Sequence, residues 1–188
     1  IIAYEGGRYR VFGETLSIGL GNALDKFGRH IGLGFPAGPQ IEKLAKKGSY
    51  IELPYSVKGM DVEFSGVVTS VMHLYNKGVS REDLCYSLQE TLFSMVVEVT
   101  ERAMAHTGKT AALVIGGVGA NQRFCEMLTL MCRDRDAQAF ACPLPYCGDN
   151  GTMIAWLGCL RFLKRKYDDL SLDYNDRLRI DDVFVDWL

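Results

Sequence analysis

Three loops carry the glycines and polar side chains that ligand-binding turns use. The most suggestive one follows the apolar run 111–115 and reads Gly116-Gly117-Val118-Gly119-Ala120-Asn121. Glycines let backbone N–H groups approach a ligand closely, and the N-terminus of a following helix adds partial positive charge for a phosphate. Asn121 could cap this helix, and its amide could also bind a hydroxyl. A tight strand-to-helix turn without a ligand explains the same residues equally well, because a lone glycine cluster is a weak signal.

The second loop, Gly148-Asp149-Asn150-Gly151, precedes an expected helix. Asp149 could cap that helix, or its carboxylate could hold a divalent cation beside a phosphate. The third loop, Ser65-Gly66, carries less information. The GGVGAN spacing does not match the GxGxxG dinucleotide fingerprint, and no acidic residue ends a strand about 20 residues later.

Two carboxylates near a glycine form another candidate group. Asp25 lies on an expected helix, and Gly38 and Glu42 follow in the next loop and helix. Such carboxylates can hold ribose hydroxyls, but they can also be solvated helix charges, which is the usual case. The pattern leaves both interpretations open.

Histidine and cysteine spacing indicates neither a metal motif nor a catalytic triad. His30, His73 and His106 form no HxxxH or HExxH pair, and the six cysteines form no CxxC pair. We expect reduced thiols in an intracellular protein, mostly buried as small hydrophobic side chains, and no zinc site made by cysteines.

Composition predicts a packed globular domain. Of the 188 residues, 48% are hydrophobic and 23% charged, and the net charge of -2 excludes a uniformly basic nucleic-acid coat without excluding a local basic patch. No stretch reaches the roughly 18 apolar residues of a membrane span, and we expect no signal peptide. The chain opens without Met inside the apolar run 1–4, so we expect a piece of a longer protein.

Hydrophobic spacing predicts the elements that must position these loops, and Ser80 is expected to cap the longest helix. We expect strands over 1–4, 9–12, 61–64, 111–115 and 138–141, and helices over 14–31, 39–47, 67–75, 81–106, 121–132 and 150–166. The alternation of strands and helices predicts an α/β fold with a mostly parallel sheet covered by helices. Ligands bind such sheets at the carboxyl ends of the strands.

Five stretches together resemble one family along essentially the whole chain. They read GETLSIGLGNALDKFGR, ELPYSVKGMDVEFSG, SLQETLFSMVVEVTERAMAH, LVIGGVGANQRF and GDNGTMIAWLG. They resemble the carboxyl-terminal half of the universal tRNA threonylcarbamoyl transferase family, formerly called O-sialoglycoprotein endopeptidase, in its archaeal and eukaryotic cytosolic branch. The resemblance implies an actin-like ASKHA fold with ribonuclease-H-like lobes, of which residues 1–188 are the carboxyl-terminal lobe. That lobe would include a helical insertion over about 14–60 and a tail over about 167–188, with a mixed sheet flanked by helices.

The resemblance also implies a reaction and its partners. A threonylcarbamoyl group moves from threonylcarbamoyl-adenylate to N6 of the adenosine adjacent to the tRNA anticodon. One divalent metal ion, Zn or Fe, takes part in each intact subunit, and the cleft accepts an ATP- or ADP-like nucleotide. The partners are tRNA and the KEOPS subunits, including a small kinase-like protein and a dimerising subunit, in the cytoplasm or also in the nucleus, with no membrane.

The resemblance also implies a role for particular residues. Asp149 would be a metal ligand. A second set would bind the adenylate substrate: Asp25, Gly38, Glu42, Gly116, Gly117 and Asn121. In that set the two glycines line the phosphate side, and Asp25, Gly38 and Glu42 hold the nucleoside. The chain departs from the family in two respects. The HxxxH metal pair of the amino-terminal lobe is absent, so we expect weak or no metal binding and no activity from this chain alone. Ser17 stands where many relatives carry aspartate.

Two other functions stay open at this point. A non-catalytic ASKHA lobe could bind a nucleotide or support assembly. A metalloprotease acting on sialoglycoproteins, implied by the old family name, is disfavoured because the chain has no HExxH motif and no recognisable nucleophile triad. Basic residues could meet tRNA phosphates or acidic partners, although solvated helix faces explain each of them; these residues are Lys43, Lys46, Lys47, Arg161, Lys164, Arg165 and Lys166.

Overall fold

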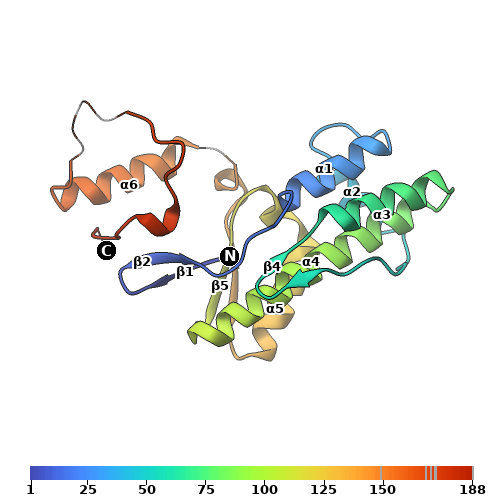
Figure 1. Ribbon diagram of the computed structural model, residues 1–188, viewed down its shortest axis with the longest axis horizontal. Helices are drawn as coiled ribbons and strands as arrows, with labels where there is room; N and C mark the ends of the chain where they lie inside the picture. Colours follow the sequence, from blue (N-terminus) through green and yellow to red (C-terminus); the bar gives the residue numbers. More distant parts are fainter. Residues whose placement is uncertain (149, 168, 170, 172, 188) are drawn as a thin grey trace.

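The computed structural model describes residues 1–148, 150–167, 169, 171 and 173–187. Figure 1 shows a helical layer, a central β region and a terminal helix with a returning tail. In chain order the elements are β1 (Ile2–Glu5), β2 (Arg8–Val11), α1 (Leu20–His30), α2 (Gly38–Ala45), β3 (Val57–Lys58), β4 (Asp61–Val62), α3 (Ser65–Asn76), α4 (Arg81–Thr107), β5 (Ala111–Val114), α5 (Gln122–Asp134), β6 (Gln138–Ala141) and α6 (Gly151–Leu163).

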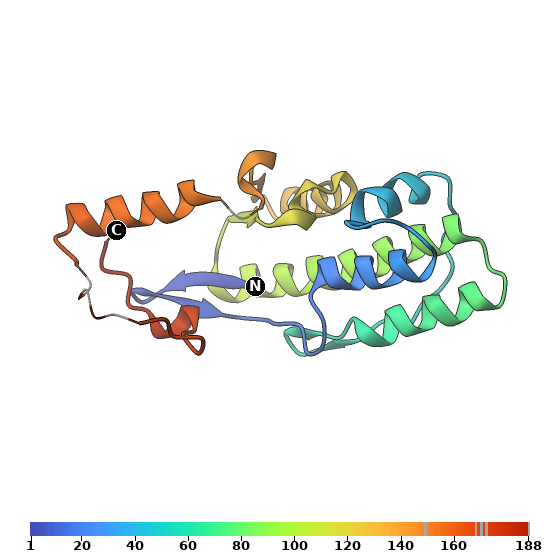
Figure 2. The ribbon, with the colours of Figure 1, turned by 90° about the horizontal axis from the view of Figure 1, so that it is seen from above.

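Helix α4 is the centre of the core. Its apolar stripe is fully buried and includes Leu84, Leu88 and Leu92. The expected cap is confirmed, because the Ser80 hydroxyl accepts a hydrogen bond from the Asp83 backbone N–H at 3.3 Å. Figure 2 shows α3 on one side of α4, and α2 with α5 on the other. These helices enclose the main hydrophobic cluster, which extends from α1 to α5.

The β region is smaller than the sequence predicts. Strands β5 and β6 form a parallel pair in register from Ala111 opposite Gln138 to Val114 opposite Ala141, and α5 connects them. One face of this pair packs against α4 and α5, while Leu113 on the other face is 64% exposed. Within the part of the chain that the structure describes, the βαβ unit therefore has helices on one face only.

The prediction of a mostly parallel sheet is wrong. Within the described residues the strands form three two-stranded sheets, and only β5–β6 is parallel. Strands β1 and β2 are joined by a turn at Gly6 and Gly7, and an equally short turn joins β3 to β4. Connections this short allow only antiparallel pairing, because a parallel partner needs a long crossover.

The helix expected from Glu14 begins only at Leu20. The segment before it is held against β4, since the Leu16 N–H donates to the Val62 carbonyl at 2.9 Å and Val62 donates to Glu14. Sheet-like bonds from a distant strand thus replace the first helical turns. The helix expected over 150–166 is also shorter and ends at Leu163.

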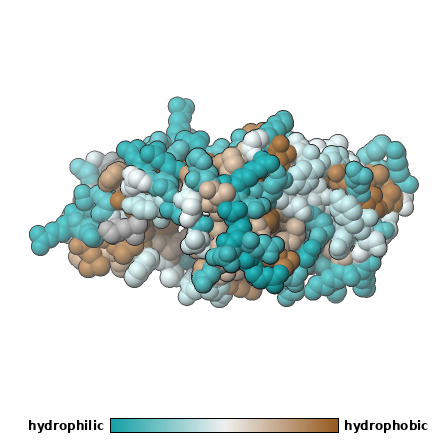
Figure 3. Space-filling model, turned by 90° about the horizontal axis from the view of Figure 1, so that it is seen from below, coloured by the Kyte–Doolittle hydropathy of each residue, from teal (hydrophilic) through white to brown (hydrophobic). Residues whose placement is uncertain are grey.

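Helix α6 lies apart from the helical layer and has no buried residue (Figure 1). Its apolar side chains are open to solvent, with Ile154 and Trp156 about two-thirds exposed. Figure 3 shows apolar side chains at the surface at this end of the molecule. The tail returns to the β1–β2 hairpin, where Val185 donates to the Gly7 carbonyl at 2.8 Å. None of the described helices is both long and apolar enough to cross a membrane.

Candidate functional site

The glycine loop connects β5 to α5 through a single 3-10 turn over Gly117–Ala120. Gly116 has φ of 82°, a conformation that favours glycine. A Cβ on Gly119 would lie 2.9 Å from Cγ1 of Val114, so close packing explains this glycine. Neither reason applies to Gly117, whose Cβ position is open. The bare backbone at Gly117 is therefore the part of the loop that local folding does not explain.

Asn121 begins α5 and is almost fully buried. Its Oδ1 accepts a hydrogen bond from the Phe124 N–H at 3.1 Å, which confirms it as a cap. Its Nδ2 donates to Oε1 of Gln89 on α4 at 2.8 Å. Both ends of the amide are thus fixed, and the loop is anchored to the core helix. Sequence reasoning missed Gln89, although a glutamine inside an apolar helix stripe is a signal that could have identified it.

Glu42 lies beside Asn121 although 79 positions separate them in the sequence. Its Oε1 accepts a hydrogen bond from the Gln122 backbone N–H at 2.9 Å. This contact joins α2 to the first turn of α5, where a negative charge stabilises the helix dipole. Burial and the Glu42 carboxylate raise the pKa of the neighbouring Cys125 thiol.

Asp25 joins α1 to the start of α2. Its Oδ1 accepts a hydrogen bond from the Ala37 N–H at 2.7 Å, one residue before Gly38. Gly38 and Glu42 lie one turn apart and share a face of α2. A Cβ on Gly21 of α1 would lie 3.6 Å from Val118, so α1 also reaches the glycine loop.

Six of the seven sequence-predicted residues therefore surround one junction. Helices α1 and α2, the 116–121 loop and the first turn of α5 meet there through the contacts of Asp25, Glu42 and Asn121. The seventh, Asp149, lies outside the described residues. Asn150 beside it caps α6, since its Oδ1 accepts from Met153 N–H at 3.1 Å.

The backbone N–H and the hydroxyl of Ser65 are already used in hydrogen bonds within the chain. The Ser65 hydroxyl donates to Glu63 at 2.6 Å, and the Ser65 N–H donates to the Ser17 hydroxyl at 3.3 Å. Hydrogen bonds from Ser17 and then Ser65 lower the pKa of the Glu63 carboxyl. Ser17 therefore supports a neighbouring carboxylate.

The described residues do not by themselves fit a metal centre. Among them no group of three histidine, cysteine or acidic side chains lies close enough to hold an ion. Burial raises the pKa of the Cys85 thiol to about 12 and also raises that of Cys132. Both thiols are therefore protonated near neutral pH, and a protonated thiol is neither a metal ligand nor a nucleophile.

Comparison with known sequences identifies close relatives. The chain is 54% identical to a tRNA N6-adenosine threonylcarbamoyltransferase of Methanocella arvoryzae over 193 residues, and equally similar to one of Thermococcus kodakarensis. It is also 54% identical to a probable bifunctional tRNA threonylcarbamoyladenosine biosynthesis protein of Methanothermobacter thermautotrophicus. These alignments cover all of this chain, 58% of the first two proteins and 36% of the third. The chain thus spans little more than half the length of the single-function relatives.

Comparison with solved structures supports the fold. The crystal structure of T. kodakarensis HypF matches 78% of this chain with a TM-score of 0.61 and 22% identity, covering 20% of the HypF chain. The α/β fold is thus of the ASKHA type that the family has. A family model described as tRNA N6-adenosine threonylcarbamoyltransferase matches residues 1–156, which hold the whole 116–121 loop and the junction around it. The chain therefore belongs to the tRNA N6-adenosine threonylcarbamoyltransferase family.

Proposed function

We propose that the protein to which this chain contributes transfers a threonylcarbamoyl group from threonylcarbamoyl-adenylate to N6 of the adenosine next to the tRNA anticodon. The observation that carries the proposal is that Glu42 and Asn121 hold the start of α5 directly after the bare loop, while Asp25 of α1 holds the start of α2. The names of the relatives, which refer to this tRNA modification, support the same reaction. In this proposal residues 1–188 are the carboxyl-terminal lobe of a two-lobe protein, with a helical insertion over about 14–60 and a tail over about 167–188.

The junction is suited to an adenylate. Gly116 and Gly117 would line its phosphate, where the backbone is bare and the N-terminus of α5 adds partial positive charge. Asp25 and Glu42 each use one carboxylate oxygen to hold a backbone N–H. A carboxylate fixed in this way can accept a ribose hydroxyl with its other oxygen. Gly38 would leave room for the nucleoside between them.

The attacking group is the exocyclic amine of adenine, so the reaction requires no protein nucleophile. The chain's own residues would bind and orient the adenylate, and positioning with electrostatic stabilisation would lower the barrier. We further propose one divalent metal ion, Zn or Fe, in the intact subunit, with Asp149 as one ligand. The described residues do not fit such an ion alone, so no step is assigned to it.

The proposed partners are tRNA and KEOPS subunits, among them a small kinase-like protein and a dimerising subunit, in the cytoplasm or also in the nucleus. Because ligand groups would come from both lobes, we expect this chain alone to be inactive. A non-catalytic nucleotide-binding or assembly module is the competing function. It predicts adenylate binding without any transfer in the full-length protein.

The test is threonylcarbamoyl transfer to tRNA by the full-length protein with its partner subunits. Glu42→Gln and Asp25→Asn should raise the KM for threonylcarbamoyl-adenylate by about tenfold, a loss of about 1.4 kcal/mol that is typical of hydrogen bonds to charged groups. Glu52→Gln is the matched control, because Glu52 is exposed and belongs to the segment between α2 and β3 instead of to the elements that form the junction. Unchanged KM values in both variants would show that the junction does not hold the adenylate. Binding without transfer by the wild-type protein would favour the assembly module.

A further inference from the structure

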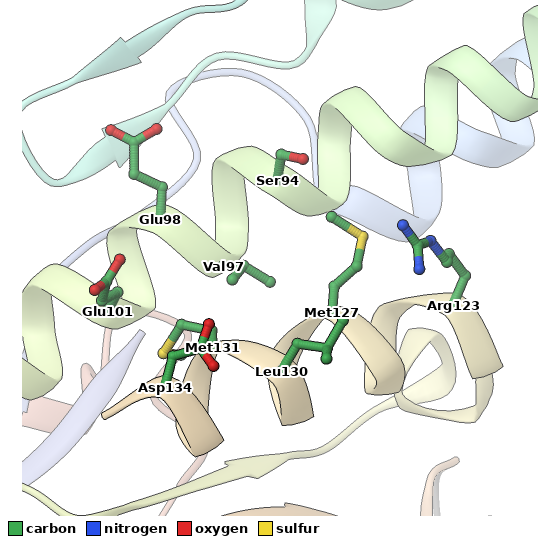
Figure 4. A pocket seen from close by; sticks show the side chains of 9 residues that line it. All are labelled: Ser94, Val97, Glu98, Glu101, Arg123, Met127, Leu130, Met131 and Asp134. Carbon is green, nitrogen blue, oxygen red and sulfur yellow. The ribbon is translucent and has the colours of Figure 1, made fainter. Parts of the chain in front are cut away.

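Two hollows outside the candidate site follow one stripe of α4 and share Ser94. The first has a volume of about 290 Å³ and is lined by Tyr50, Tyr55, Tyr86, Glu90, Thr91 and Ser94. The second has a volume of about 460 Å³ and lies between α4 and α5 (Figure 4). Because they adjoin, we treat them as one groove and call it the α4–α5 groove.

The first hollow contains a buried polar atom without a partner. Thr91 is 3% exposed, and its Oγ1 makes no hydrogen bond to any described residue. A buried hydroxyl is costly to leave unpaired, so native structures rarely retain one without a reason. The atom itself is closed to the hollow, with less than 1 Å² of accessible area, so a ligand there could donate a hydrogen bond to it only after the Thr91 side chain turns about χ1.

The walls of the first hollow suit a cation. Tyr50 and Tyr55 are 57% and 50% exposed, and with Tyr86 they present three aromatic rings around one space. Ammonium and guanidinium groups bind over such rings. The Tyr55 hydroxyl donates to Glu98 at 2.5 Å, which places a carboxylate where the two hollows meet. Glu90 is held in place by a bidentate pair of hydrogen bonds from the Arg123 guanidinium.

The second hollow combines an apolar floor with an acidic rim. Figure 4 shows Val97 of α4 facing Met127, Leu130 and Met131 of α5. Methionine-rich surfaces adapt to apolar partner side chains, and a groove between two helices can accept a third amphipathic segment. Leu130 is 43% exposed although it belongs to this floor. The floor therefore offers apolar area that this chain does not cover.

The rim of the second hollow carries Glu98, Glu101 and Asp134, against the single base Arg123. Arg102 pairs with Glu98, and Arg135 pairs with Glu101 at 3.3 Å. These pairs are partly exposed and worth little, so an incoming base can share the carboxylates. Among the described residues, the ion pair that Asp134 makes is with its neighbour Arg133, at a distance of 4.0 Å. The arginines named at this rim are each paired with a carboxylate already, so an RNA phosphate would have to displace that carboxylate.

We propose that the α4–α5 groove binds a segment of a partner protein that presents an apolar face flanked by lysine or arginine side chains. The apolar face lies on the floor made by Val97, Met127 and Leu130. One cation enters the tyrosine-lined hollow and, once the Thr91 side chain has turned toward it, donates a hydrogen bond to Thr91 Oγ1. This inference does not depend on the adenylate site, because none of the six residues assigned to adenylate binding lines either hollow.

The experiment uses the full-length protein and a fluorescein-labelled 18-residue helical peptide made of leucine and lysine, with leucines along one face. Fluorescence anisotropy should show binding, and a peptide with glutamate in place of lysine should bind at least 100-fold more weakly. Glu101→Lys combined with Asp134→Lys should weaken the lysine peptide by at least tenfold. Asp173→Lys combined with Asp176→Lys changes the net charge equally in the exposed tail and should change affinity less than twofold.

A second variant separates binding from stability. Thr91→Val keeps the shape of the side chain but removes the unpaired hydroxyl, so the folded protein should melt at the same or a higher temperature. The same variant should bind the lysine peptide severalfold more weakly, because the cation loses its acceptor. A destabilised Thr91→Val variant with unchanged peptide affinity would contradict the assigned role.

Three results would overturn the proposal. Equal losses in the groove and tail double variants would show a general charge effect. Weakened tRNA binding by Glu101→Lys with Asp134→Lys, with peptide affinity unchanged, would assign the groove to RNA. The wild-type protein could also form a dimer that the peptide fails to dissociate. If Glu101→Lys with Asp134→Lys abolished that dimer, the groove would be assigned to a second copy of the protein.

Discussion

The buried amide pair of Gln89 and Asn121 allows the sharpest test of how the loop is held. Gln89→Leu keeps the volume but removes the acceptor, leaving Asn121 Nδ2 buried without its 2.8 Å partner. Such an orphaned donor costs about 1–3 kcal/mol. Asn121→Ala also removes the cap of α5, which is worth about 1 kcal/mol, and orphans Gln89 in turn. The double variant loses the cap, and with it the acceptor of the Phe124 N–H, but it leaves no orphaned side-chain amide at either position of the pair.

The two substitutions should therefore be strongly non-additive. We expect the double variant to be destabilised by about 2 kcal/mol less than the single variants together predict, within the range found for directly bonded pairs. Urea unfolding of the four proteins, followed by far-UV circular dichroism, measures the free energies. Gln40→Leu is the control, because Gln40 is exposed and its amide bonds only to the Gly34 carbonyl. Its cost should stay within about 0.5 kcal/mol.

Additive costs would refute this reasoning. They would mean that the amide pair is solvated or replaced in solution, so that Gln89 does not hold the loop. A second readout concerns the ligand: Gln89→Leu should lower adenylate affinity while leaving the tRNA affinity unchanged, since the loop and not the outer surface is disturbed. Equal losses for both substrates would indicate global unfolding instead of a local effect.

Two further predictions concern packing and pH. Gly28→Ala would press a methyl group into Ala37 and separate α1 from α2, which should cost about 1–3 kcal/mol as measured by thermal unfolding. Gly66→Ala meets open space in α3 and should stabilise the protein by up to about 1 kcal/mol. Equal effects of the two substitutions would contradict the packing argument. Hydrogen bonds, first of all from Ser17, lower the folded-state pKa of Glu63, so the stabilisation is present above the ordinary pKa of a glutamate and is lost as the pH falls through the folded pKa. Wild type should exceed Ser17→Ala in stability at pH 7, and the difference should disappear in acid; a constant difference from pH 7 to 3 would exclude this linkage.

The helices could be predicted well because their signals are local. The 27-residue α4 combines a long apolar stripe with a serine cap, and its observed bounds lie within a residue or two of the expected ones. The first helix failed because its beginning depends on a distant strand: the bonds of Leu16 with Val62 have no trace in the residues near position 14. Pairing partners far away in sequence override local helical spacing.

The elements around the candidate site could be predicted from the sequence, but their connections could not. Glycines followed by Asn121 indicated a turn before a helix, and this is confirmed. The role of Gln89 was not predicted: a glutamine inside an apolar helix stripe can indicate a buried polar group, but it does not show which partner that group faces. Nor does any spacing show that Glu42 meets α5 through Gln122. Such contacts follow from how three helices pack, which one-dimensional patterns do not encode.

The capping and ligand-binding interpretations of Asn121 do not exclude each other. Its amide holds Phe124 N–H and Gln89, so the loop keeps its shape without a ligand. Asp25 and Glu42 are likewise each fixed by one backbone N–H. A site whose groups are already immobilised loses little conformational freedom on binding. The hydrogen bonds that explain these residues structurally are therefore the same bonds that would prepare them for an adenylate. Gly117 has no structural reason to be glycine, so it is the position at which the structural and the ligand-binding roles of the loop can be told apart.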